Sequence, residues 1–198
     1  MTDFLIAHWL DILTTILGLA YIILEYRASL WMWVVGFFMQ SLGIILYYQK
    51  GLYADCAMEF YYLGMTVYGF LCWKGFLHRS AAKAQGAMPI THMPQQRGLL
   101  FALLAAALWG AIYYLLDNFT DSTVPALDSF TTALSMVGIW ALAHKYLEQW
   151  IVWIMVDIVT CFLYHTKGLP FKSALYALYV AIAIAGFFRW RKLMLAER

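Results

Sequence analysis

The sequence carries little charge for its length. Of its 198 residues only 12% are charged, with 13 Lys or Arg against 11 Asp or Glu and a formal net charge of +2. Soluble domains carry about 25% charged residues. A balance this close to neutral gives no indication of a phosphate-binding surface, so we predict no nucleic-acid partner.

Cysteine and histidine are also scarce, and neither forms a motif. The three cysteines lie in apolar runs without C-x-x-C spacing, which indicates small buried side chains and neither a disulfide framework nor a zinc site. The sequence has no H-E-x-x-H motif and no nucleophile elbow. We therefore predict no metal, no cofactor and no catalytic residues, and keep an intramembrane enzyme as a weaker alternative. The residues concerned are Cys56, Cys72, Cys161, His8, His78, His92, His144 and His165.

Long polar segments are missing with one exception. Residues 75–97 are rich in Gln, Pro, Gly and basic residues, and predict a flexible loop with no room for a soluble domain. The N-terminus has no basic region and no A-x-A cleavage site before its apolar run. This favours a retained spanning helix over a cleaved signal peptide.

What the chain does have is hydrophobic length: 64% of its residues are hydrophobic. A helix crosses about 30 Å of hydrocarbon with roughly 17–25 residues. Seven segments meet that requirement, so we predict an all-α integral membrane protein with seven transmembrane helices. The predicted segments are residues 8–26, 30–48, 55–74, 98–116, 127–144, 149–165 and 172–190.

Two short turns punctuate these segments in the same way. Lys50-Gly51 and Lys167-Gly168 each separate two apolar runs, and Pro170 follows the second turn. Glycine adopts the left-handed conformation that ends a helix, and proline suits the first position of the next one. We predict tight helical hairpins at both places.

The sequence is also similar to itself. With a shift of 117 positions and no gap, 18 of the 65 pairs between residues 11–75 and 128–192 are identical. The identical pairs include polar and aromatic residues, which chance matching of two apolar helices does not explain. They include Asp11 and Asp128, Trp33 and Trp150, Lys50 and Lys167, Gly69 and Gly186, and Trp73 and Trp190. We infer an internal duplication.

The number of crossings then predicts the symmetry. Three helices in each half, joined by one linker helix, bring both halves into the membrane in the same orientation, which is a 3+1+3 parallel repeat about an axis along the membrane normal. We assign a first three-helix repeat to residues 1–76, a cytoplasmic loop and linker helix to 77–120, and a second repeat to 121–198. The linker helix is mainly Ala and Leu, as expected for a helix that faces lipid.

Basic residues mark one side of the membrane. Ten of the 13 Lys and Arg fall on the side of the C-terminus, and the other three are Lys50, Lys167 and Lys172. By the positive-inside rule the C-terminus is cytoplasmic and the N-terminus is outside. The outer loop near Asp117, Asp121 and Asp128 would mildly favour an approaching cation, or would simply reflect topology.

Three strongly polar side chains lie at least one turn inside the ends of the predicted spans. Gln40 and Asp157 occupy matching positions of the repeat near the middle of the second and sixth segments, and Glu59 lies about one turn inside the third. An ionisable group at the bilayer centre costs about 2.5–3.5 kcal/mol on insertion scales and normally marks a site or pathway. The structural alternative is an interhelical hydrogen bond that holds two helices in register.

Aromatic residues surround these positions. Trp153 lies one turn from Asp157 on the same face, and a ring beside a carboxylate can bind a flat organic cation by stacking, cation–π attraction and charge pairing. Trp33, Tyr62 and Trp150 belong to the same group. Trp31, Trp73 and Trp190 lie at helix ends beside basic residues and predict an interfacial belt.

These residues together carry a resemblance over nearly the whole chain. The ordered set resembles the Pnu family of vitamin transporters, whose branches carry nicotinamide riboside (PnuC) or thiamine (PnuT). Its elements are Trp31-x-Trp33-x-x-Gly36, Tyr48-x-x-Gly51-Leu52-Tyr53-Ala54-Asp55, Tyr62, Tyr68-Gly69-x-x-x-Trp73, Phe130-Thr131-Thr132-Ala133-Leu134, Trp150-x-x-Trp153-x-x-x-Asp157 and Tyr164-x-x-Lys167-Gly168-Leu169.

The resemblance implies a fold like that of the SWEET sugar transporters, a homotrimer, and a multi-pass protein of the bacterial inner membrane. It also implies facilitated diffusion of a cationic vitamin that a cytoplasmic kinase traps by phosphorylation. Nicotinamide riboside is the first substrate prediction and thiamine the alternative, because Glu59 and Asp157 replace amides that are common in the family. A membrane scaffold or receptor without transport is the other alternative. The predicted substrate-binding residues are Trp33, Gln40, Glu59, Tyr62, Thr131, Trp150, Trp153 and Asp157.

Overall fold

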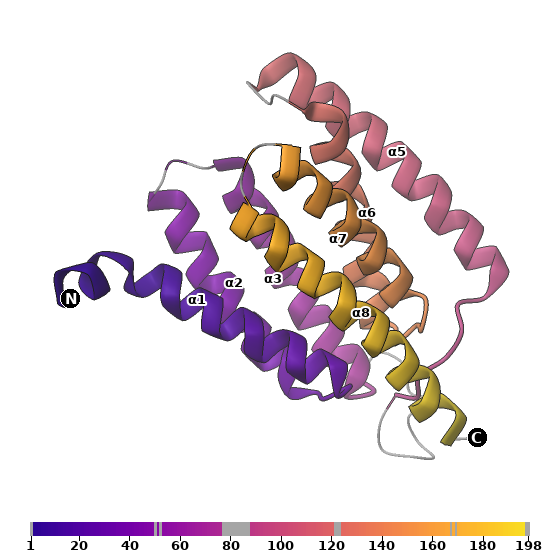
Figure 1. The fold of residues 1–198 in the computed structure, drawn as a ribbon. Helices are drawn as coiled ribbons and strands as arrows, with labels where there is room; N and C mark the ends of the chain where they lie inside the picture. Colours follow the sequence, from indigo (N-terminus) through magenta and orange to yellow (C-terminus); the bar gives the residue numbers. More distant parts are fainter. Residues whose placement is uncertain are drawn as a thin grey trace. The chain divides into compact units, whose positions relative to one another are not determined.

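The computed structural model describes residues 2–49, 51, 53–76, 88–120, 124–166, 168 and 170–196, and its regular structure in these ranges is helical (Figure 1). The described chain divides into two compact units, Met1–Met88 and Pro89–Arg198. Unit 1 holds α1 (Thr2–Tyr26), α2 (Trp31–Gln49) and α3 (Tyr53–Trp73); unit 2 holds α5 (Gln95–Phe119), α6 (Pro125–Ala143), α7 (Gln149–Thr166) and α8 (Pro170–Ala196).

Each of the seven predicted spans overlaps one of these helices, which confirms the all-α fold class. Five helical stretches are long and apolar enough to cross a membrane, in α2, α5, α6, α7 and residues Lys172–Ala196 of α8. In α1 the described apolar stretch is Ile16–Tyr26. The third helix, α3, includes Asp55 and Glu59 and is not among these five.

The predicted loop between the halves is wrong at its C-terminal end. Residues Gln95, Gln96 and Arg97 form the first turn of α5, which begins directly after Pro94. Polar side chains at a helix end can reach water. The helix therefore extends one turn beyond its apolar segment, into residues whose composition is typical of a loop. Residues 77–87 of that loop lie outside the described residues.

The second helix of each three-helix set packs against both of the others. In unit 1, α2 contacts α1 and α3; in unit 2, α7 contacts α6 and α8, and α5 packs against α6. The described part of α5 exposes most of its apolar side chains and buries Phe101. This agrees with a helix that faces lipid.

One aromatic packing unit occurs in both units. The Trp33 indole lies against Gly69, where an added Cβ would overlap the ring, and meets the Trp73 ring edge-on at 5.6 Å between centroids. In unit 2 an added Cβ at Gly186 would lie 2.5 Å from the Trp150 indole.

The Trp150 indole meets the Trp190 ring edge-on, with 5.7 Å between the ring centroids. Trp73 and Trp190 are 3% and 0% exposed, so the prediction that they form an interfacial belt is wrong. Their positions at helix ends gave no sign that a tryptophan from the neighbouring helix would cover them. Trp31 is 68% exposed and remains a candidate for the belt.

The turns of the two units also match. Gly51 and Gly168 have φ of 71° and 68°, which confirms the predicted left-handed glycines, and α8 begins at Pro170 as predicted. The turn before α2 places Ala28 at φ 51°, and the turn before α7 places Lys145 at φ 52°. Both turns close with the same pair of backbone hydrogen bonds, from residues 28 and 29 to 25 and 24, and from 145 and 146 to 142 and 141.

In unit 2 the chain before α5 is fastened onto the α6–α7 turn. Thr91 N–H donates to the Lys145 carbonyl at 3.2 Å, and Leu147 N–H donates to the Thr91 carbonyl at 3.0 Å. Glu148 accepts from Met93 N–H at 2.8 Å and contacts His92 Nδ1 at 2.8 Å. This segment therefore holds the start of α5 to the start of α7.

Candidate functional site

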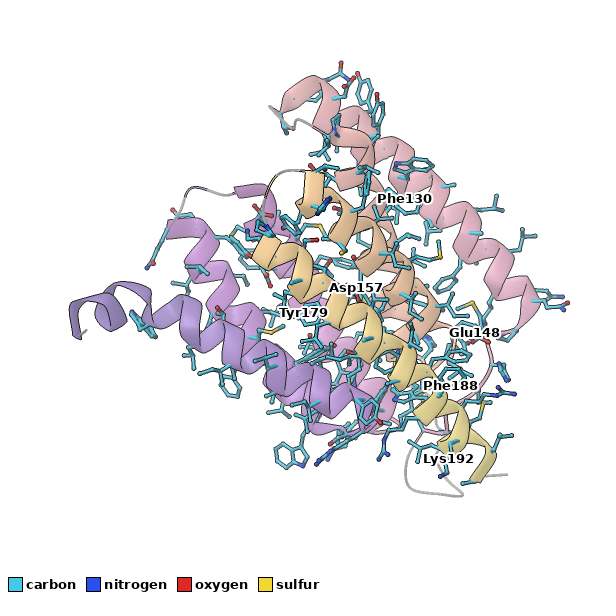
Figure 2. All side chains as sticks on the ribbon, in the orientation of Figure 1. Phe130, Glu148, Asp157, Tyr179, Phe188 and Lys192 are labelled. Carbon is cyan, nitrogen blue, oxygen red and sulfur yellow. The ribbon has the colours of Figure 1, made fainter. Side chains whose placement is uncertain are left out.

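Asp157 lies in the middle of α7 and is 8% exposed. Its carboxyl group acts electrostatically on the phenol of Tyr179, which comes from α8 (Figure 2). Among the described residues no Lys, Arg or His forms an ion pair with it. A buried carboxyl group with a tyrosine but no basic partner is suited to receive a cation from outside the chain.

Trp153 lies one turn before Asp157 on the same helix. Its ring covers Gly138 of α6, where an added Cβ would be 3.5 Å from the indole. The indole N–H is buried and has no hydrogen-bond partner among the described groups. The ring therefore packs against Gly138 in the α6–α7 interface, and its N–H donor is unused among the described groups.

Thr131, on α6, is half-buried. Its hydroxyl is 3.1 Å from the Leu127 carbonyl and 3.0 Å from the Asp128 carbonyl of its own helix. The hydroxyl proton is therefore used within α6, and the oxygen lone pairs are what Thr131 can offer a ligand.

The other two predicted tryptophans are packed inside their units. Trp33 and Trp150 are each 1% exposed, and each ring is enclosed by a glycine and a second tryptophan. Both indole N–H groups are buried without a partner among the described groups. The structure thus places these rings in helix interfaces, two turns from Gln40 and Asp157 respectively.

In unit 1, Gln40 is 8% exposed, the same value as its repeat partner Asp157. Gly43, one turn further along α2, leaves space that the Glu59 carboxylate of α3 fills, because an added Cβ would be 2.9 Å from the carboxylate carbon. The Oε2 atom of Glu59 is buried and has no hydrogen-bond partner among the described groups. The structure therefore puts Gln40 and Glu59 in one α2–α3 seam.

Tyr62 is half-buried in the same unit. Its ring meets Tyr61 at 5.6 Å, and its phenol acts electrostatically on Tyr21 of α1. A Cβ added at Gly36 would lie 3.1 Å from the Tyr21 ring and 3.5 Å from the Thr66 hydroxyl. Unit 1 thus gathers phenol, amide, hydroxyl and carboxyl groups from three helices.

The set predicted from sequence missed three of these residues. Thr66 is 2% exposed and its hydroxyl is buried without a partner among the described groups. Tyr21 covers Gly36 in the way that Trp153 covers Gly138. Tyr179 faces Asp157, and its identity with Tyr62 across the repeat was the signal that could have found it.

The described residues support one kind of chemistry better than others. No group of three His, Cys, Asp or Glu side chains within the described ranges is placed to hold a metal ion. Instead, unit 2 brings an indole, a phenol and a buried carboxyl group together along α7 and α8. Such an arrangement binds a flat cation by charge pairing and contact with ring faces.

Comparison with known proteins identifies the family of the chain. The family model described as nicotinamide mononucleotide transporter matches residues 8–192. The chain is 27% identical to the riboflavin/roseoflavin transporter RibM of Streptomyces davaonensis, over 92% of this chain and 84% of that protein. It is 21% identical to the nicotinamide riboside transporter PnuC of Escherichia coli, with the same two coverages.

A solved structure is similar in fold. The crystal structure of the vitamin B3 transporter PnuC matches 96% of this chain and 84% of its own, with a TM-score of 0.72 and 21% identity. These relatives are transporters, so the prediction that the chain is not an enzyme is confirmed, as is the resemblance to the Pnu family. The chain is a multi-pass membrane protein and belongs to the nicotinamide mononucleotide transporter family.

Proposed function

We propose that this protein carries a flat, cationic vitamin across the bacterial inner membrane, with nicotinamide riboside as the first candidate and thiamine as the alternative. The pyridinium ring of nicotinamide riboside and the thiazolium ring of thiamine are both planar cations with hydrogen-bonding groups. Relatives at 21% and 22% identity are named as nicotinamide riboside transporters, which favours the first candidate.

The observation that carries the proposal is the buried carboxyl group of Asp157 in a membrane-spanning helix, 8% exposed, with Trp153 one turn away and Tyr179 opposite. A charge at the bilayer centre costs about 2.5–3.5 kcal/mol on insertion scales. A hydrogen-bonded or charge-paired ligand would offset that cost. In the proposed complex Asp157 pairs with the ring cation, and Trp153 and Tyr179 contact its faces.

Unit 1 carries other residues that we propose to contact the substrate. Glu59 has a buried oxygen available, and Gln40 offers an amide to ribose or aminopyrimidine groups. Tyr62 adds a phenol. We assign Trp33 and Trp150 a supporting role, because their rings are already enclosed, and Thr131 the role of an acceptor.

The proposed mechanism is facilitated diffusion. Substrate enters from the side of the N-terminus, and rocking of one three-helix set against the other opens the cytoplasmic side, where a kinase traps the product by phosphorylation. The matching turns at Ala28 and Lys145 support a duplicated unit. A SWEET-like parallel arrangement, an N-terminus outside, a cytoplasmic C-terminus and a homotrimer complete the proposal.

Riboflavin is a second candidate because the relative at 27% identity is named as a riboflavin/roseoflavin transporter. Its ring system is flat but uncharged. Two buried carboxyl groups at Glu59 and Asp157 would then have no positive partner in the ligand, so we rank riboflavin after the cationic vitamins.

The proposal is tested by counterflow in liposomes that contain the purified protein. Labelled nicotinamide riboside, thiamine and riboflavin are offered separately, and Asp157→Asn is measured beside the parent. We expect exchange of one cationic vitamin and its loss in the variant. Retention of both binding and exchange by Asp157→Asn would refute charge pairing.

Two further outcomes of the same experiment are informative. Thermal stabilisation by a vitamin without counterflow would identify a receptor or scaffold. Exchange that stops when proton and sodium gradients are dissipated would replace facilitated diffusion with a coupled mechanism.

A further inference from the structure

Three tyrosines form a continuous row along the α7–α8 seam of unit 2. The ring centroids of Tyr164 and Tyr176 are 5.3 Å apart with the planes tilted by 34°. Tyr176 and Tyr179 are 5.5 Å apart and edge-on. These separations are those of rings in contact. We call Tyr164, Tyr176 and Tyr179 the tyrosine path.

The tyrosine path runs from the α7–α8 turn to Asp157. Tyr164 is seven residues after Asp157 on α7, and a helix rises about 1.5 Å per residue, so it lies about 10 Å nearer the turn. On α8, Tyr179 lies the same number of residues beyond Lys172. Figure 2 shows Asp157 and Tyr179 on these facing helices, and the two side chains interact electrostatically.

A reciprocal contact fixes the two helices beside the tyrosine path. The Ser173 hydroxyl donates to the Cys161 carbonyl at 3.1 Å, and the Cys161 thiol donates to the Ser173 carbonyl at 3.3 Å. Sliding of α8 along α7 would break both hydrogen bonds. The spacing of the rings is therefore supported by two side-chain-to-backbone hydrogen bonds and does not depend on the rings alone.

The end of the path near the turn already holds a cation. The Lys172 ammonium group lies 5.1 Å from the centroid of the Tyr164 ring, within the range of cation–π attraction. Lys172 is exposed and extends from the first turn of α8. The Tyr164 face is thus demonstrably accessible to a positive charge, and that charge is on a flexible side chain.

We propose that Tyr164, Tyr176 and Tyr179 guide a flat organic cation from the α7–α8 turn to Asp157, and that Lys172 is a resident cation which the substrate displaces from Tyr164. The inference rests on the proposed function, since it requires a cationic substrate. A cation–π contact at an exposed ring strengthens binding by only about two- to fivefold. The three rings of the tyrosine path are half-buried. Contacts this weak let the ligand move from ring to ring, and Asp157 at the end retains it.

The test measures association by rapid-mixing tryptophan fluorescence, with nicotinamide riboside and thiamine as separate probes. Tyr164→Leu and Tyr176→Leu are expected to slow association by about two- to fivefold each. Tyr164→Phe and Tyr176→Phe keep the ring face and are expected to remain within twofold of the parent. Phe162→Leu, on α7 but 59% exposed, is the matched control and should have no effect.

Lys172→Gln tests the displaced cation without altering the packing, because its side chain is exposed. Association is expected to become about two- to fivefold faster at low salt. The tyrosine path is refuted if folded Leu variants associate as fast as the parent, or if Lys172→Gln slows association or leaves it unchanged. If either of these results is found while binding by the parent still depends on Asp157, the proposed function stands and only the tyrosine path fails. If the parent binds neither cation, both fail.

Discussion

The two units share a backbone but exchange one pair of side chains. In unit 1 the large ring comes from the first helix, where Tyr21 covers Gly36 of the second. In unit 2 the large ring comes from α7, where Trp153 covers Gly138 of α6. The residues are equivalent under the 117-position shift, so the same gap between helices is filled from opposite sides.

This exchange decides which helix carries a ring next to the polar centre. In unit 2 the ring of Trp153 and the carboxyl group of Asp157 belong to one helix, one turn apart. In unit 1 the second helix presents Gly36 and Gln40 at these positions, and a phenol faces them from α1. The carboxyl group of unit 2 therefore lies on the helix that carries the ring, whereas the Gln40 amide of unit 1 does not.

The seams diverge further toward the hairpin turns. Asp55 and Glu59 of α3 correspond to Lys172 and Tyr176 of α8. The left-handed turn positions and the Trp–Gly contacts recur in both units, whereas the side chains lining the seams differ in charge and shape. The differences between the units therefore lie in the seams and not in the packing that they share.

The shared packing predicts the largest effect. Gly69→Ala and Gly186→Ala each force a methyl group into a tryptophan ring, and overpacking costs about 1–3 kcal/mol or more. We expect both variants to lose thermal stability in detergent by similar amounts. Gly64→Ala on α3 is the matched control, since nothing lies within 4 Å of the added Cβ, and it should be neutral or stabilising. Clearly unequal losses of thermal stability at positions 69 and 186 would show that the two units do not depend equally on this Trp–Gly packing.

The polar centres predict the next effect. Asp157→Asn removes a charge and should weaken binding of a cationic vitamin about tenfold or more, because hydrogen bonds to charged groups contribute about 1.5–3 kcal/mol. Gln40→Met keeps the shape and removes a neutral amide, which contributes about 0.5–1.5 kcal/mol. Titration calorimetry should therefore show the larger loss for Asp157→Asn. Equal losses would mean that the two halves contribute in the same way.

Much of the fold could be predicted from the sequence because its signals are local. Hydrophobic length located the helices, Gly51 and Gly168 located two turns, and Pro170 located a helix start. The left-handed positions at Ala28 and Lys145 could not be predicted, since neither is glycine. The hydrogen bonds of the turn and the packing of the following helix impose that conformation.

The candidate site was harder to predict than the fold. The repeat register paired Gln40 with Asp157, and the two side chains are equally buried. It gave no means of distinguishing a ring that faces a ligand from one enclosed by packing, which is why Trp33 and Trp150 were grouped with Trp153. That distinction depends on Gly69 and Gly186, which lie on the neighbouring helices.

A smaller effect is expected at Glu59. Its carboxylate rests against Gly43 with one oxygen lacking a hydrogen-bond partner among the described groups, so its charge destabilises the folded protein in the absence of ligand. Glu59→Gln should raise the melting temperature of the ligand-free protein and lower the stabilisation that a cationic vitamin provides. Gln49→Lys, at the exposed end of α2, makes the same change of net charge and should do neither. An unchanged response to ligand in Glu59→Gln would exclude Glu59 from the site.

The smallest effect concerns the turns that the two units share. A non-glycine residue in the left-handed region costs about 1 kcal/mol, and Ala28 has φ of 51°. Ala28→Gly removes that cost, so we expect a modest rise in melting temperature. Ala57→Gly, in the exposed interior of α3, should lower it by a similar amount, since glycine costs about 1 kcal/mol relative to alanine in a helix. The same substitution should therefore change the melting temperature in opposite directions at two sites of unit 1. A loss of stability in both variants would show that the Ala28 turn is held in another conformation. The match with Lys145 would then fail.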